Sequence, residues 1–274
     1  MATIPDKAFP DYDSPPVNEV VCGIQFHPLK AMTLPYVGLL WQKFRSRYPN
    51  CREVAPLVPA IERFDEQPVE NLNPFGDTFP TPRIWFETGD GNGLIKVQRD
   101  RFLHNWKKER PEDEYPHFKH VITRFQDCLT TFEQFLQENK LEEISPTQYE
   151  LTYTNHIDVG LGWLDLSEIG GVFPDFNWRV SAQRFLPVPE AINWQTIFAL
   201  PERAGRLRVS IRRGKRLSDG LPTLLLELTA RGITTDPSRL AMWSWFDMAH
   251  EWIVCGFTDL TSDMMHKNIW RRKR

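Results

Sequence analysis

One long amphipathic stretch constrains the fold of this chain more than any other feature of its sequence. Between residues 115 and 139 an apolar stripe recurs at i, i+3, i+4 and i+7, the spacing of one face of an α-helix. A one-sided helix must bury its stripe, so we expect Phe125, Leu129 and Phe132 to pack against a sheet. The acidic residues 112–114 precede this stripe, where the dipole of a helix N-terminus favours negative charge.

The residues before this helix predict a strand, a helix and four further strands. Residues 17–26 are β-rich and end before a proline, and residues 33–48 carry apolar residues at helical spacing. The glycine-rich residues 89–93 separate two β-like runs and predict the turn of a β-hairpin. The four runs are residues 53–64, 83–88, 94–99 and 101–106.

The second half of the chain predicts the same order of elements. Residues 149–157 alternate as a strand, and residues 164–169 predict a short helix. A long helix begins after Thr235-Asp236-Pro237, an N-cap followed by a proline at the first helical position, and runs toward Trp270. The β-like runs between these helices are residues 178–186, 193–200, 206–212 and 224–231.

The pattern therefore predicts an α+β fold of two sequential β-α-β4-α halves, each with an antiparallel sheet packed on a long helix. We expect a loose leader over residues 1–14 and a first α+β half over residues 15–145. The second half, with a basic C-terminal tail, occupies residues 146–274. The duplicated order resembles the TATA-binding-protein-like and helix-grip topologies, a likeness that implies no shared function.

Composition argues against several functional classes. Lys+Arg 33 against Asp+Glu 36 disfavours a globally basic nucleic-acid binder. No run approaches the roughly 18 apolar residues of a membrane span, and the N-terminus does not have the profile of a signal peptide. We therefore expect a cytoplasmic protein with no membrane partner. The 4 cysteines lie far apart without a CxxC pair, which predicts reduced thiols and no metal site.

Several short motifs carry a family resemblance. They are PPVNEVV at residues 15–21 running into Phe26, LIKVQRDRFLHNW at 94–106, Tyr115-Pro116, Tyr153-Thr154-Asn155-His156-Ile157, and Ala249-His250-Glu251 with Phe257. In this order and spacing the chain resembles a sporadically distributed family of uncharacterised prokaryotic proteins. The resemblance implies a patchily inherited accessory gene, of the kind found on mobile or defence islands. It implies no enzymatic activity, cofactor or catalytic residue.

The strongest local signal is the segment 203–216, in which seven of fourteen residues are basic and none is acidic. In a strand, the arginines at 206, 208 and 212 share one face while the intervening apolar residues face the core. Such a face would dock phosphate or an acidic partner, because guanidinium groups pair with both. The alternative is a solvated strand whose arginines pair with Glu202, Glu227 or other acids. The candidate partner-binding residues are Arg206, Arg208, Arg212, Arg213, Lys215 and Arg216.

Two polar clusters have the residue types of a catalytic or metal site. Asp247, His250 and Glu251 lie within one and a half turns of the last helix, but no HExxH spacing is present. We therefore expect His250 to be a buried, hydrogen-bonding side chain. Asn155-His156 with Asp158 is a polar strand end, because no motif of a nucleophile accompanies it.

A second basic segment interleaves cations with aromatic residues, a combination that serves single-stranded nucleic acid. Acidic residues interrupt it, so we expect the aromatic residues to be used in packing. The segment comprises Arg99, Arg101, His104, Trp106, Lys107 and Lys108.

We expect a non-enzymatic accessory protein that docks another protein, in an antiviral defence or mobile-island setting. The 10 tryptophans support this expectation, since Trp is enriched at protein interfaces. The alternative is a nucleic-acid-binding accessory that uses the arginine-rich strand, and the third possibility is an enzyme without a recognisable motif.

Overall fold

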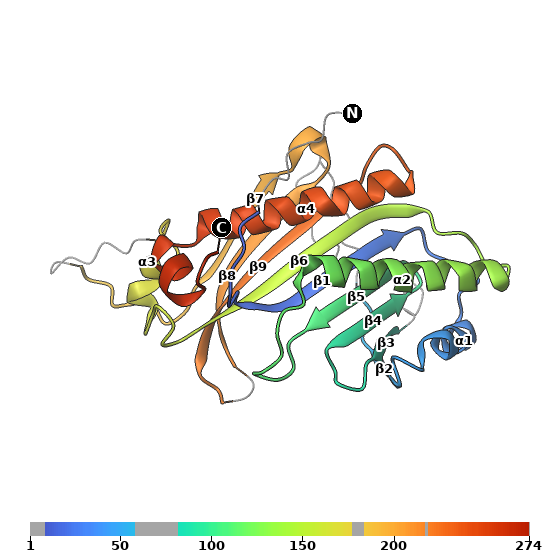
Figure 1. The fold of residues 1–274 in the computed structure, drawn as a ribbon, viewed down its shortest axis with the longest axis horizontal. Helices are drawn as coiled ribbons and strands as arrows, with labels where there is room; N and C mark the ends of the chain where they lie inside the picture. The colour runs from blue at the N-terminus through green and yellow to red at the C-terminus, as the bar shows by residue number, and fades with distance from the viewer. Residues whose placement is uncertain (1–8, 58–81, 177–183, 217–218, 274) are drawn as a thin grey trace.

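The computed structural model describes residues 9–57, 82–176, 184–216 and 219–273. Within these residues nine strands form one antiparallel sheet, in the order β2-β3-β4-β5-β1-β6-β9-β8-β7. The long helices α2 (His117–Glu138) and α4 (Arg239–Leu260) both lie across the same face of this sheet (Figure 1). The predicted α+β class is confirmed.

The first half follows the predicted element order. The turn at residues 89–93 joins β3 to β4, which pair from Ile84↔Val97 to Glu87↔Leu94, so the predicted hairpin is confirmed. Strand β2 overlaps the predicted run 53–64 only at residues 53 and 54; residues 55–57 are not in a strand, and residues 58–64 lie outside the described residues. The elements before α2 are β1 (Val17–Phe26), α1 (Leu34–Phe44), β2 (Asn50–Val54), β3 (Arg83–Glu87), β4 (Gly93–Gln98) and β5 (Arg101–Lys107).

In the described part of the second half, three strands lie between β6 and α4, where the sequence predicts four. Most of the predicted run 178–186 lies outside the described residues, and its residues 184–186 are not in a strand. The elements before α4 are β6 (Pro146–Asp158), η1 (Leu166–Glu168), α3 (Ile169–Val172), β7 (Asn193–Ala199), η2 (Pro201–Arg203), β8 (Arg206–Lys215) and β9 (Pro222–Gly232).

The prediction of two separate sheets is wrong, because the two halves share one. Strand β1 pairs with β5 on one side and with β6 on the other, so that Cys22 faces both His104 and Leu151. Each half would otherwise expose the backbone N–H and C=O groups of its first strand, and pairing β1 with β6 satisfies both sets. Outward from this pair the orders are β5-β4-β3-β2 and β9-β8-β7. An internal repeat stays a prediction.

The core lies between the sheet and the helices, as the stripe on α2 predicts. Phe125, Leu129 and Phe132 are all buried. Phe132 stacks on Phe102 of β5, with ring centroids 4.8 Å apart and planes inclined by 9°. Helix α4 adds Phe246 to the same layer, 5.5 Å from Phe125 between ring centroids. The two long helices therefore share one aromatic core above the centre of the sheet.

The ends of both long helices differ from the prediction. The carboxylate of Asp113 accepts the backbone N–H groups of Glu109 and Arg110 at 3.0 and 2.8 Å, so these acids close a turn and α2 starts after them. The N-cap of α4 is Ser238, because the carboxylate of Asp236 is already bound to the N–H of Ser238. Helix α4 ends at Leu260, and a separate π-helix, η3 (Met265–Ile269), follows.

Residues 9–14, predicted as part of a loose leader, are held against the end of the chain. Tyr12 forms an isolated β-bridge with Arg272, and its hydroxyl lies 2.8 Å from Thr258 Oγ1. The ring of Tyr12 is buried against Phe257 and Trp270, at centroid distances of 5.7 and 6.2 Å. Burial of this aromatic ring explains why the segment is ordered.

The four cysteines are free thiols, as the sequence predicts. None of the helices in the described part of the chain combines the length and apolarity that a membrane span needs.

Candidate functional site

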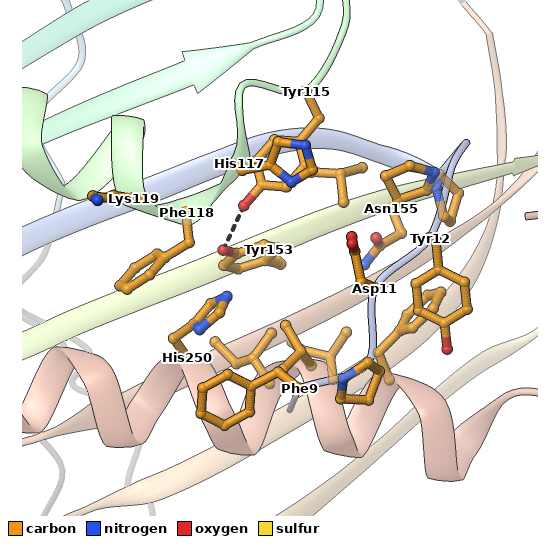
Figure 2. A pocket seen from close by; sticks show the side chains of 18 of the residues that line it. Phe9, Asp11, Tyr12, Tyr115, His117, Phe118, Lys119, Tyr153, Asn155 and His250 are labelled. Carbon is orange, nitrogen blue, oxygen red and sulfur yellow. Dashed lines mark hydrogen bonds between the residues drawn. The ribbon is translucent and has the colours of Figure 1, made fainter. Parts of the chain in front are cut away.

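An open cavity of about 630 Å³ lies between α2, α4 and the middle of the sheet. The N-terminal segment before β1 forms its remaining wall, and Figure 2 shows how the polar side chains gather around it. Its principal lining residues are Phe9, Asp11, Tyr12, Val17, Tyr115, Phe118, Tyr153, Asn155, Asp247, His250, Val254 and Phe257.

The floor of the cavity comes from β6. Because side chains alternate along a strand, Tyr153 and Asn155 both point to the helix-covered face. The hydroxyl groups of Tyr153 and Tyr115 lie 2.8 Å apart, the hydrogen bond drawn in Figure 2. Asn155 donates from Nδ2 to the carbonyl oxygen of Leu226 at 3.1 Å, which fixes its amide and leaves Oδ1 as an acceptor. A register shift next to Val17 interrupts the regular pairing of β1 with β6 beside this floor.

The walls of the cavity are aromatic and interlocked. His250, on α4, stacks on Phe118 of α2, with ring centroids 4.0 Å apart and planes inclined by 7°. The ring of Phe9 meets His250 edge-on at 5.9 Å. Asp247, His250 and Val254 all face the cavity because they recur at i, i+3 and i+7 on one helix.

Burial sets the protonation of the polar groups. It raises the pKa of Tyr115 and of Tyr153 above the ordinary value of 10 and lowers the pKa of His250 to about 4. At neutral pH the two phenols are therefore protonated and the imidazole is neutral. Desolvation also raises the pKa of Asp247.

Only some residues of each polar cluster that the sequence predicts line the cavity. His250 and Asp247 reach the cavity, but Glu251 does not line it. The prediction of a hydrogen-bonding histidine is not met among the described residues, because the rings of Phe118 and Phe9 occupy the surroundings of His250. Within the described residues no group of three or more His, Cys, Asp or Glu could hold a metal ion.

Of the predicted polar strand end of β6, only Asn155 lines the cavity. His156 belongs to the opposite face of the strand. Asp158 forms an ion pair with Arg216 at 2.8 Å.

Four of the motifs that carry the family resemblance meet at the cavity. They are far apart in the sequence, and the fold brings residues of each to the same place. The lining residues that belong to these motifs are Pro15, Pro16, Val17, Tyr115, Tyr153, Asn155, His250 and Phe257. The sequence analysis assigned no site residue from the Tyr115-Pro116 motif or the motif at residues 153–157 to this cavity, and so it missed Tyr115 and Tyr153. Their shared membership of the motifs was the one signal that pointed to them.

The arginine-rich segment forms β8 with the predicted alternation. Leu207, Val209 and Ile211 are buried, and α4 packs on that face. Arg206, Arg208 and Arg212 therefore belong to the opposite face of the sheet.

Part of the charge of this segment is already engaged. Arg206 and Arg208 each take part in an interaction with another group of the chain. Burial raises the pKa of Glu227 on the neighbouring strand, while the charges of Arg212 and Arg231 oppose that rise. These contacts favour the alternative in which the arginines balance cross-strand acids.

The other candidates of the segment do not extend the arginine face. Arg213 is opposite Leu224 in the register, which places it with the core-facing positions, and its Nη1 donates to the carbonyl oxygen of Glu190 at 2.6 Å. Arg216 is paired with Asp158 and Asp219. Lys215 is exposed at the end of β8.

The second basic segment is used for packing, as expected. Arg101 is buried and makes two hydrogen bonds of 3.1 Å to the carboxylate of Asp100. His104 is buried, and the ring of Trp106 lies 5.6 Å from that of Tyr115.

Comparison with family models and with curated proteins gives no match for this chain. The resemblance inferred from the motifs therefore stays a prediction.

Proposed function

We propose that this protein binds a small molecule in the cavity between α2, α4 and the sheet. The observation that carries the proposal is the cavity itself, about 630 Å³ with mostly aromatic and aliphatic walls and a few convergent polar groups. Sites for small molecules in proteins span roughly 300 to 1,000 Å³ and share this composition. The convergence of four sequence motifs on the same cavity supports it independently of the volume.

The side chains of the cavity suit recognition better than proton transfer. A catalytic acid or base works best with a pKa near the working pH. The pKa of His250 is lowered to about 4, and those of Tyr115 and Tyr153 are raised. At neutral pH these groups are fixed hydrogen-bond donors and acceptors, so we propose binding without turnover.

A fragment screen tests the proposal. A panel of aromatic and alicyclic fragments is presented to the wild-type protein and to Val254→Trp, in which an indole fills part of the cavity. Leu240→Trp is the matched control, because Leu240 lies on the same helix and is 77% exposed. We expect ligand-observed NMR to detect fragments that bind wild type and Leu240→Trp but are lost with Val254→Trp. Fragments that bind all three variants equally would contradict the proposal.

Docking of another protein, the function predicted from the sequence, is a second candidate. It is favoured by a mixed surface on the face of the sheet opposite α4. Arg212 is exposed there, and Ile197 of the edge strand β7, which is 46% exposed, pairs with Arg208. Arginine beside apolar residues is typical of protein interfaces. We keep an accessory role in a prokaryotic defence system and a cytoplasmic location as part of this proposal, and nucleic acid as the alternative partner.

Charge reversal on β8 tests this candidate. Arg206, Arg208 and Arg212 are replaced together by Glu, which leaves the buried residues of the strand unchanged. We expect lost capture of the products of neighbouring genes and an unchanged thermal melt. A nucleic-acid titration at two salt concentrations tests the alternative, since phosphate contacts weaken with salt. Loss of stability without selective loss of a partner would show that these arginines only balance Glu227 and its neighbours.

A further inference from the structure

Among the residues that the structure describes, the charged groups that line the cavity are not balanced. Asp11 and Asp247 contribute two carboxylates, whereas Lys119 is the one Lys or Arg among the described residues that line it. No ion pair joins Lys119 to either carboxylate in the described part of the chain. His250 adds no positive charge at neutral pH, because burial lowers its pKa to about 4. Among the described lining residues the carboxylates therefore outnumber the Lys and Arg side chains by two to one.

The two carboxylates lie at different places in the cavity. Figure 2 shows the Asp11 side chain pointing into the cavity, on the side of Asn155. Asp247 lies one turn before His250 on α4, at the exposed margin of the cavity. Desolvation is the cause that raises the pKa of Asp247, and no neighbouring cation counteracts it among the described residues. A positive charge in the cavity would supply the missing partner.

The aromatic walls add to this preference. Six Phe and Tyr rings line the cavity: Phe9, Tyr12, Tyr115, Phe118, Tyr153 and Phe257. The face of such a ring is negative and attracts a cation within about 6 Å of its centroid. Their contacts with one another, such as the edge-on pair Tyr12 and Phe257 at 5.7 Å, hold the rings in place before a ligand arrives. With carboxylates and aromatic rings in the same lining, the cavity has the chemistry of a site for an organic cation.

We propose that the ligand of this cavity is a small organic cation: a protonated or alkylated nitrogen on an apolar body. This inference rests on the proposed small-molecule function and names the class of the ligand. The nitrogen faces the Asp11 carboxylate and the Oδ1 atom of Asn155, and the apolar body fills the space between the rings of α2 and α4. The volume of about 630 Å³ exceeds what a single protruding lysine side chain would fill, which favours a free molecule.

Three probes with one body and different charges test the inference: 4-phenylbutylamine, 4-phenylbutan-1-ol and 4-phenylbutyrate. Their dissociation constants are measured by calorimetry at pH 7 for wild type, for Asp11→Asn with Asp247→Asn, and for Asp259→Asn. Asp259 is the control because it is exposed on the same helix and does not line the cavity. Thermal melts of all variants confirm that they fold.

We expect wild type to bind the ammonium probe at least tenfold more tightly than the carboxylate probe, with the alcohol between them. The double variant should lose about tenfold for the ammonium probe and keep its affinity for the alcohol, and Asp259→Asn should match wild type. Tighter binding of the alcohol or of the carboxylate, or an ammonium preference that survives in the double variant, would overturn the cation inference and leave the cavity as a binding site. Failure of all three probes to bind, or binding unaffected by Val254→Trp, would overturn the proposed function as well.

Discussion

Truncation of Phe125 tests whether the two long helices share one core. The ring of Phe125 is fully buried and contacts three other rings, Phe102 on β5 and Trp243 and Phe246 on α4. Phe125→Ala therefore removes contacts to both the sheet and the second helix. Truncations of buried Phe cost about 3 to 5 kcal/mol, and each aromatic pair contributes roughly 0.5 to 1.5 kcal/mol beyond the buried area. With three pairs lost, we expect a cost of about 4 to 5 kcal/mol.

This cost is large against the total of about 5 to 15 kcal/mol that stabilises an ordinary protein. Urea unfolding followed by tryptophan fluorescence and by circular dichroism measures it as a shift of the midpoint at unchanged slope. Phe185→Ala is the control, since Phe185 is 96% exposed, and it should change the free energy of unfolding by no more than about 0.5 kcal/mol. A loss below about 1.5 kcal/mol for Phe125→Ala, or equal losses for the two variants, would refute the shared core.

Two further predictions concern backbone packing and acid stability. A Cβ atom on Gly232 would lie 1.8 Å from the carbonyl oxygen of Ala204, so Gly232→Ala should lower the urea midpoint strongly. A Cβ atom on Gly38, within α1, would meet nothing within 4 Å, so Gly38→Ala should raise the midpoint slightly. Burial lowers the pKa of His104 from the ordinary value of 6.5 to about 3 in the folded protein. Between these two pH values the unfolded chain binds more protons than the folded protein, so the free energy of unfolding falls on acidification. Between pH 7.5 and 5 this loss is about 2 kcal/mol, and His104→Phe should remove it while the same change at the exposed His27 should not.

One result would contradict each of these two predictions. Equal midpoints for Gly232→Ala and Gly38→Ala would show that the strand end has room to shift. An unchanged dependence of stability on pH in His104→Phe would show that water or a rearrangement solvates the imidazole in the folded protein.

Elements with a strong period were predictable from the sequence. The stripe of α2 and the alternation of β8 each show which residues are buried, because burial of one face is a local property of a helix or strand. The pairing of β1 with β6 was not predictable: each strand has one partner in its own half, and no local pattern shows what pairs with its other edge. The cap of α4 was missed because Thr235, Asp236 and Ser238 can all cap a helix, and the turn at Asp236 decides between them.

The candidate site was predictable only in part. His250 and Asp247 attracted attention because they have the residue types of a catalytic or metal site and lie within one and a half turns of the same helix. Tyr115 and Tyr153 did not, because a tyrosine in a strand or before a helix is also a common packing residue. The hydrogen bond between these two hydroxyl groups joins residues 38 positions apart and depends on the sheet that brings them together. The charge imbalance of the cavity likewise arises only when Asp11 and Asp247 meet in space.

The central place of β1 has a consequence for how the chain acquires its fold. During synthesis this strand is made before both of its partners, β5 at residues 101–107 and β6 at residues 146–158. Closing such long loops costs entropy before the contacts compensate, which slows folding of proteins with high contact order. During synthesis β1 must wait with at least one open edge until β6 has been made. Chaperone contact with residues 17–26, or aggregation of chains stopped before residue 146, is therefore where defects in the biogenesis of this protein should begin.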